Sequence, residues 1–280
     1  MPEMPEIQAH AERLTEDFAG RVLKRFTPLT FTALKTAVPP PDEAYGLPLV
    51  DVGRRGKYLL VCFEPVTFVV HLMQGGRLLV DAKQSAKPRG GQARWVFADP
   101  GPALLLTEQG TERRAGVWVV PTASLDTTTP LDRLGPEAAG IGPETLKARL
   151  GDRNMRVHGF LRDQRQIAGI GRRLANEVLH RAKTSPFAMT GKLGDDGVAA
   201  VAAAIDECID EGLAYERGRD DMSSSKDRPG AVHGRTGEAC PVCGDTIRAV
   251  EYSGYTVNYC PTCQTAGKVL ADNTTSRFLK

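Results

Sequence analysis

The stretch CPVCGDTIRAVEYSGYTVNYCPTC, residues 240–263, decides the C-terminal part of the fold. It holds two Cys-x-x-Cys pairs, Cys240 with Cys243 and Cys260 with Cys263, separated by 16 residues. Each pair places two thiolates on one turn, and two such turns on a short hairpin form a closed tetrahedral S4 set that suits zinc. The sequence therefore predicts one structural Zn²⁺ in a zinc ribbon. The alternative, two redox-active Cys-x-x-Cys pairs, fits the regular spacing and the strand-like residues between the pairs less well.

Length, charge and cysteine use bound the class of protein. The chain has 280 residues and a formal net charge of +2, so any nucleic-acid surface must come from local clustering of charge. Four cysteines grouped within 24 residues indicate a metal site rather than disulfides in a cytosolic protein. No apolar run approaches the roughly 18 residues of a membrane span. The acidic N-terminus lacks the apolar run of a secretory signal. We therefore expect a cytoplasmic protein that does not bind membranes.

Hydrophobic periodicity changes along the chain and predicts an α+β fold. Residues 5–18 carry apolar side chains at helical spacing. Short runs rich in Val, Leu and Phe then alternate with turn residues, which is typical of an antiparallel sandwich or barrel. These runs span residues 57–63, 67–73, 77–81, 93–98, 103–107 and 116–120. Helical patterns follow at residues 143–150, 154–164, 172–183 and 196–213.

These patterns divide the chain into three predicted domains. The first is a β-sandwich flanked by helices over residues 1–125. The second is a helical domain over residues 126–225, and the third is the zinc ribbon over residues 226–280.

A basic segment surrounds a glycine turn in the helical domain. Residues 149–183 contain nine Lys or Arg and three Asp or Glu, a local net charge of +6. The turn Gly169-Ile170-Gly171 opens a helix, and backbone N–H groups at a helix N-terminus can bind a phosphate. Two helices around such a turn also resemble a helix-turn-helix DNA module. A solvated basic helix pair is the alternative interpretation.

The N-terminus carries a possible nucleophile. Removal of Met1 before a proline leaves Pro2 with a free secondary amine. Such an amine can attack an aldehyde carbon and form an iminium, as lysine does in Schiff-base chemistry. Its pKa lies below that of a lysine, so more of it is neutral at pH 7. Taken alone, Pro2 could equally be an ordinary terminal residue and Glu3 a first-turn helix charge.

Four ordered motifs, together with the cysteine spacing, resemble the formamidopyrimidine-DNA glycosylase and endonuclease VIII family over nearly the whole chain. The family opens with PELPEVE, and this chain has PEMPEIQ at residues 2–8. The family's glycine-lysine strand start corresponds to residues 53–58, GRRGKY. Its helix-two-turn-helix motif LLDQxxIAGIGN corresponds to residues 160–172, FLRDQRQIAGIGR. Its ribbon start VYGRxGEPC corresponds to residues 232–240, VHGRTGEAC.

The resemblance implies roles for five residues of the N-terminal domain. Pro2 attacks C1′ of the damaged nucleotide, Glu3 transfers protons during ring opening, and Glu6 supports this at the helix start. Lys57 contacts phosphate and assists catalysis, although alone it would pass for a solvated cation at a strand end. His71 matches a phosphate-contacting histidine. The damaged base is flipped out of the stack.

Several positions depart from the family pattern. The family's phosphate-binding asparagine after the glycine turn is Arg172, and the phosphate-gripping arginine of the zinc hairpin is Tyr255. The three residues that fill the hole left by the flipped base in formamidopyrimidine-type members correspond to Gln74, Arg113 and Ala115. The phenylalanine wedge is thus absent. The segment before the ribbon start is also too short for a lesion-covering loop. These departures favour an endonuclease VIII-like lesion range over 8-oxoguanine: oxidised pyrimidines, abasic sites or an unusual bulky lesion.

The resemblance thus predicts a bifunctional DNA glycosylase and AP lyase of base excision repair. We expect a monomer that acts on double-stranded damaged DNA and nicks the strand by β,δ-elimination. One alternative is a non-catalytic damaged-DNA binding protein on the same scaffold, which would have no need of Pro2, Glu3 and Lys57. Another is a zinc-ribbon protein-interaction module, which the local charge of +6 disfavours.

Overall fold

The computed structural model describes residues 1–110, 113–222, 227–252 and 254–270. Its contacts divide the chain into two units. Unit 1 comprises residues 1–134 with 219–222, and unit 2 comprises residues 135–218 with the chain from 223 onward. Within the described residues, no helix is both long and apolar enough to cross a membrane. The predicted division into domains at residues 1–125, 126–225 and 226–280 stays a prediction.

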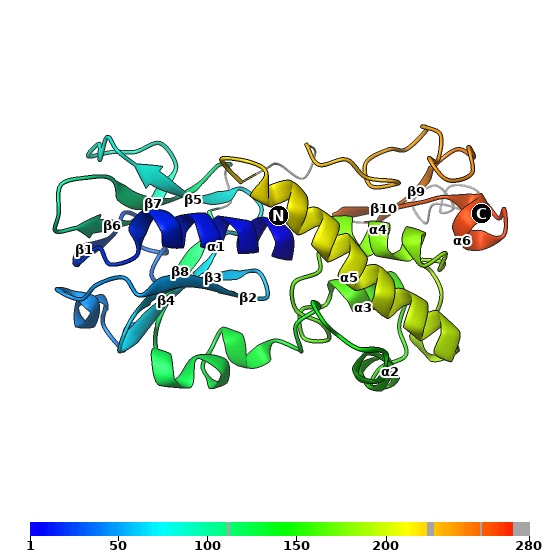
Figure 1. Ribbon diagram of the computed structural model, residues 1–280, viewed down its shortest axis with the longest axis horizontal. Coiled ribbons are helices and arrows are strands. Elements are labelled where there is room, and N and C mark those ends of the chain that lie inside the picture. Colours follow the sequence, from blue (N-terminus) through cyan, green and yellow to red (C-terminus); the bar gives the residue numbers. More distant parts are fainter. Residues whose placement is uncertain (111–112, 223–226, 253, 271–280) are drawn as a thin grey trace. The chain divides into compact units, whose positions relative to one another are not determined.

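Unit 1 is an antiparallel β-sandwich with one long helix (Figure 1). One sheet has the strand order β1-β6-β7-β5 and the other has the order β2-β3-β4-β8. The helix is α1 (Met4–Phe18) and the strands are β1 (Leu23–Pro28), β2 (Asp51–Arg55), β3 (Tyr58–Phe63), β4 (Val66–His71), β5 (Gly76–Asp81), β6 (Gly91–Phe97), β7 (Ala103–Glu108) and β8 (Gly116–Pro121). Short 3-10 helices occur at Pro41–Ala44, Thr122–Thr127 and Leu131–Arg133.

Aromatic side chains join the two sheets of unit 1. The ring of Phe26 on β1 lies 5.1 Å from that of Phe68 on β4 and 4.9 Å from that of Trp95 on β6. All three side chains belong to one buried cluster. Strand β4 is buried on both faces, because a second cluster around Val69 and Leu131 covers its outer side. The core therefore fixes the position of β4 and of His71 at its end.

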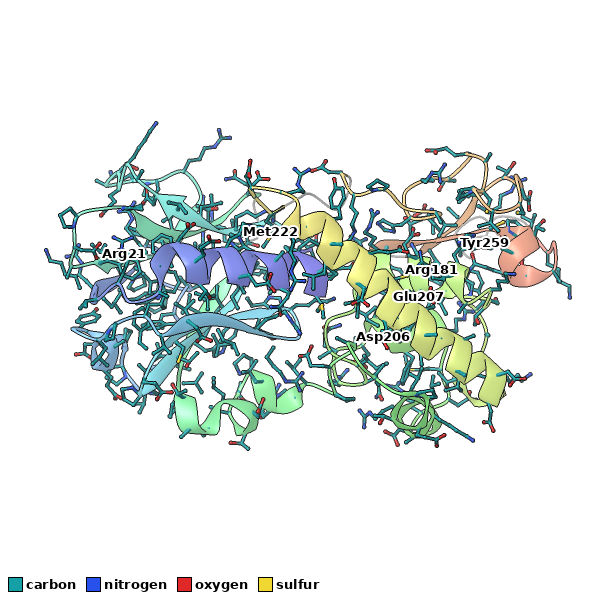
Figure 2. All side chains as sticks on the ribbon, viewed as in Figure 1. Arg21, Arg181, Asp206, Glu207, Met222 and Tyr259 are labelled. Carbon is teal, nitrogen blue, oxygen red and sulfur yellow. The ribbon has the colours of Figure 1, made fainter. Side chains whose placement is uncertain are left out.

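Unit 2 combines helices with a two-stranded hairpin (Figure 1). Its elements are α2 (Pro143–Gly151), α3 (Val157–Arg162), α4 (Arg172–Arg181), a 3-10 turn at Thr190–Lys192, α5 (Asp195–Arg217), β9 (Arg248–Tyr252), β10 (Tyr255–Tyr259) and α6 (Pro261–Thr265). Figure 2 shows Arg181 of α4 beside Glu207 of α5, and their charged groups are 3.4 Å apart. A second carboxylate on α5, that of Glu211, lies 2.7 Å from Arg181. These ion pairs connect α4 to α5.

Candidate active site, zinc centre and nucleic-acid interface

The start of α1 fixes the two acidic residues predicted for catalysis. Glu3 is the N-cap residue, and its side chain accepts a hydrogen bond from the backbone N–H of Glu6 in a reciprocal capping box. The backbone N–H of Glu3 donates to Glu6 Oε2 at 3.0 Å. Pro2 is buried, and Glu3 and Glu6 are 4 % and 2 % exposed. The capping box therefore holds the Glu3 side chain in one position next to Pro2.

Polar contacts hold α1 against β2. Thr15 Oγ1 donates to the carbonyl of Val52 at 3.1 Å and accepts from its N–H at 2.8 Å. Arg54 donates to Gln8 Oε1 at 3.1 Å and to the carbonyl of Gly56 at 3.0 Å. Gly56 has a φ of 57° and forms the turn before Lys57, which favours glycine there. These contacts connect α1 to the turn before Lys57, the lysine that is predicted to bind phosphate.

Lys57 and His71 lie at neighbouring ends of β3 and β4. Tyr58, next to Lys57, pairs with His71 across the sheet, and the two rings are 4.6 Å apart. Burial, with the added effect of the Lys57 charge, lowers the pKa of His71 to about 4. The imidazole is therefore neutral at pH 7. Its Nδ1 accepts the backbone N–H of Met73 at 3.3 Å, which leaves Nε2–H as the donor. Lys57 itself is only 6 % exposed.

The loop after β4 presents one of the three predicted gap-filling positions. Gln74 is exposed, and Met73 beside it adopts a left-handed conformation with a φ of 53°. Arg113 is also exposed. By contrast, Ala115 is 1 % exposed, and its N–H donates to Glu108 Oε2 at 2.6 Å. Ala115 therefore offers no side chain to a DNA base stack.

A glutamine that the sequence analysis did not single out shapes the glycine turn of unit 2. Gln164 accepts the N–H of Gly169 at 2.9 Å and donates to the carbonyl of Ile170 at 2.8 Å. Gly169 has a φ of 106°, which requires glycine. Gly171 is the N-cap of α4, and Arg172 is its first residue. The turn therefore presents the N-terminus of α4 together with the Arg172 side chain.

Arginines of the helical segment gather on the tip of the β9–β10 hairpin. The guanidinium of Arg162 lies 3.9 Å from the ring centroid of Tyr255, which stacks on Tyr252 at 4.9 Å. Arg156 donates to the Tyr252 hydroxyl, and Arg172 Nη1 lies 3.5 Å from the carbonyl of Gly254. The sequence analysis predicted Arg172 and Tyr255 but missed Arg156 and Arg162, whose partners lie about 90 residues away.

A hollow of about 890 Å³ lies beside this tip, between α4 and residues 227–264, the zinc segment. Four arginines are among the residues that line it: Arg172, Arg173, Arg228 and Arg235. Carboxylates of Asp227, Glu238 and Glu251 also line it. The local excess of positive charge suits a phosphodiester backbone.

The four cysteines of the zinc segment come together as predicted. Cys240 Sγ lies 3.9 Å from Cys263 Sγ, and Cys243 Sγ lies 3.4 Å from Cys260 Sγ. A tetrahedral zinc with Zn–S bonds of about 2.3 Å needs sulfur separations of about 3.8 Å. The donor set therefore fits one structural zinc. The sulfurs of Cys240, Cys260 and Cys263 also lie within 4.8 Å of a ring nitrogen of His180, a residue of α4 that the sequence analysis did not predict.

Glu177 of α4 anchors the zinc segment to the helices. Its carboxylate accepts three backbone N–H groups, from Ala231 at 2.7 Å, Val232 at 3.1 Å and His233 at 2.7 Å. Gln264 Nε2 donates to the carbonyl of Thr184 at 3.0 Å, just after α4. Charge-assisted bonds of this kind are roughly twice as strong as neutral ones. The zinc segment is thus positioned by the same helix that begins at the glycine turn.

Three segments of the chain match domains of known proteins. Residues 1–117 match the formamidopyrimidine-DNA glycosylase N-terminal domain, residues 134–224 match the H2TH domain of that glycosylase, and residues 237–266 match the zinc finger found in FPG and IleRS. The formamidopyrimidine-DNA glycosylase of Pelotomaculum thermopropionicum is 32% identical over 94% of this chain and 99% of the relative. An uncharacterized formamidopyrimidine-DNA glycosylase-like protein of Mycobacterium tuberculosis is 41% identical over 54% of this chain and 98% of its own length.

Solved structures share the fold. The formamidopyrimidine-DNA glycosylase of Lactococcus lactis, in complex with a THF-DNA and an inhibitor, matches with a TM-score of 0.83 and 20% identity. The match covers 94% of this chain and 100% of that structure. Sandwich, helix-two-turn-helix and zinc finger together define an enzyme of the DNA glycosylase and AP lyase class. The chain belongs to the formamidopyrimidine-DNA glycosylase family of base-excision repair enzymes.

Proposed function

We propose that the chain removes oxidised bases from double-stranded DNA through an iminium on Pro2 and then nicks the strand. The observation that carries this proposal is the buried Pro2-Glu3-Glu6 start of α1, in which a capping box orders the Glu3 carboxylate beside the terminal amine. Met1 is 40% exposed and precedes Pro2, so its removal frees that amine. We infer a monomer, because one chain supplies every residue in the proposal.

Each residue has a part in the reaction. The neutral Pro2 nitrogen forms a bond to C1′ while the bond from C1′ to the base breaks, and the departing base takes a proton from water. The Glu3 carboxylate then takes the proton of the Pro2 nitrogen and passes it to O4′, so the sugar ring opens as the iminium forms. The resulting iminium acidifies the C2′ hydrogens, so β-elimination breaks the 3′ C–O bond and δ-elimination the 5′ C–O bond. Water then releases Pro2. Lys57 and the Nε2–H of neutral His71 would bind phosphate oxygens, which orients the sugar.

The zinc finger positions DNA-binding groups and takes no part in the chemistry. The four thiolates of Cys240, Cys243, Cys260 and Cys263 would fill every zinc position, so bound zinc supplies structure to the segment. Glu177 then holds that segment on α4, where Arg172 and the hairpin tip meet. We propose that Arg172, Tyr255 and Arg162 grip the DNA backbone together, with Arg162 providing the charge that the tyrosine lacks.

Replacing Arg172 with alanine tests this interface. We expect Arg172→Ala to weaken binding about tenfold to damaged and undamaged duplexes alike, since a charged phosphate contact carries no sequence information. The slope of log affinity against log salt should fall by about one unit. Binding isotherms at several salt concentrations measure both. Lys147→Ala is the matched control, because Lys147 pairs with Asp195 at 2.7 Å; its slope should stay at the wild-type value. An unchanged slope for Arg172→Ala excludes the contact.

We further propose a lesion range centred on oxidised pyrimidines. Gln74 is exposed where a gap-filling residue is needed, whereas Ala115 is buried and cannot act as a wedge. The segment before the zinc finger is pinned by Arg173, which donates to the carbonyls of Arg228 and Pro229, and by Glu177. These bonds hold residues 228–233 against α4, so those residues are too restrained to close over a bulky purine lesion.

A panel of duplexes, each with one lesion, tests this range. Single-turnover rates of base release should be about tenfold or more higher for an oxidised pyrimidine than for 8-oxoguanine opposite cytosine. An abasic duplex reports strand nicking separately. Equal or faster release of 8-oxoguanine contradicts the proposed range. Binding without any base release or nicking by Met-free protein would instead favour the damage-binding alternative.

A further inference from the structure

We propose that His180 is a reserve zinc ligand, which closes the metal site as a Cys3His set when the Cys243 thiolate is lost. This inference rests on the proposed four-thiolate site and adds a residue to it. Structural zinc sites with three cysteines and one histidine are chemically as suitable as four-cysteine sites.

The geometry of His180 is that of a ligand almost in place. His180 lies in the last turn of α4 and is 5 % exposed. Its Nε2 is 3.3 Å from Cys240 Sγ. The ligand atoms of His180, Cys240, Cys260 and Cys263 all lie within 4.8 Å of one another. Tetrahedral sites with Zn–N and Zn–S bonds of about 2.0–2.3 Å have donor separations of about 3.5–3.8 Å, so contraction by about 1 Å closes this set.

The four cysteines are not equally protected. Cys240 and Cys260 are 3 % and 0 % exposed and Cys263 is half-buried, whereas Cys243 is exposed. An accessible thiolate is the first to react with an electrophile or to be oxidised. Among the described residues, the ligand atoms that lie within 4.8 Å of one another belong to His180, Cys240, Cys260 and Cys263, and the group does not include Cys243. The His180 imidazole therefore supplies the fourth ligand beside the three remaining sulfurs when the Cys243 thiolate is lost.

The position of His180 does not depend on Cys243. Glu177, one turn earlier on α4, holds the backbone of residues 231–233, and Gln264 bonds to Thr184 after the helix. These bonds keep α4 against the zinc segment. In the intact site the Nε2–H of His180 donates to the Cys240 thiolate, which orients that ligand. Ligation by Nε2 needs the tautomer with its proton on Nδ1, so the proton moves from one ring nitrogen to the other and none is gained or lost.

Zinc retention in wild type and four variants tests the proposal. Full-length wild type, Cys243→Ser, Cys260→Ser and Cys243→Ser/His180→Phe are dialysed against a chelator, and bound zinc is measured by elemental analysis. We expect one zinc per chain in wild type and in Cys243→Ser. Cys260→Ser removes a sulfur from both possible sets, so it should hold none. The double variant should also hold none, and Cys243→Ser/His180→Gln repeats this test with a polar replacement.

Cobalt substitution gives a second readout. The absorption of Co²⁺ bound to Cys243→Ser should show a tetrahedral site with a thiolate charge-transfer band weakened by about a quarter, because three sulfurs replace four. Loss of zinc from Cys243→Ser as complete as from Cys260→Ser overturns the role of His180. So does retention of zinc by both double variants. Wild type without zinc would instead overturn the proposed four-thiolate site, so the two failures are distinguishable.

Discussion

A chain that keeps Met1, or carries an N-terminal tag, is expected to lose all covalent trapping on abasic DNA. In such a chain the Pro2 nitrogen belongs to an amide, whose lone pair is delocalised and cannot attack C1′. Both base release and strand nicking should fall below detection.

The control for this prediction is the same tag at the C-terminus. That protein has a free Pro2 amine and should trap abasic DNA like the untagged enzyme. Affinity for DNA should be similar in both tagged proteins, since Arg172 and the hairpin tip belong to unit 2, whereas Pro2 belongs to unit 1. Equal trapping by the two tagged proteins contradicts the assignment of Pro2 as nucleophile.

Replacing Glu3 with glutamine should slow base release by about 10²-fold or more, because the proton donor for ring opening is lost. Nicking at a preformed abasic site should fall less, since that substrate has already lost its base. The amide oxygen of glutamine can still accept the N–H of Glu6, so we expect stability to fall by less than about 1 kcal/mol. Single-turnover kinetics and thermal unfolding separate the two effects.

Glu16→Gln is the matched control for this variant, because Glu16 is an exposed carboxylate on the same helix. It should leave both rates unchanged. If Glu3→Gln slows base release only in proportion to its loss of folded protein, Glu3 is a helix cap and not a proton donor.

The sequence predicted the elements that its local patterns define. The apolar runs became β3 to β8, and the helical patterns became α1 to α5, because both signals are local. Strands β4 and β7 are buried along nearly their whole length, so they appear as continuous apolar runs, whereas β3 is buried at alternate residues. Strands β1 and β2 were missed. They lie at the edges of their sheets and carry Lys24, Arg25, Arg54 and Arg55, which protect an edge from pairing but hide the strand pattern.

The site was predicted where one short motif contains it and missed where distant segments meet. Each Cys-x-x-Cys pair is a local motif that brings its two sulfurs onto one turn, and the four sulfurs lie together as expected. Glu177 and His180 look like ordinary helix residues in the sequence, because their partners lie more than 50 residues away. The stack of Arg162 on Tyr255 has the same origin: no pattern in either segment indicates it. Such contacts follow from tertiary packing alone.

The most direct measurement of the central claim is the chemical position of the trapped DNA. The untagged, Met-free enzyme is treated with borohydride during reaction with an abasic duplex, digested with a protease, and mapped by mass spectrometry. We predict that the reduced adduct lies on the nitrogen of Pro2, in a peptide that begins at this residue and contains Glu3 and Glu6. An adduct on a lysine such as Lys57, or no adduct from protein that still binds the duplex, would contradict the account.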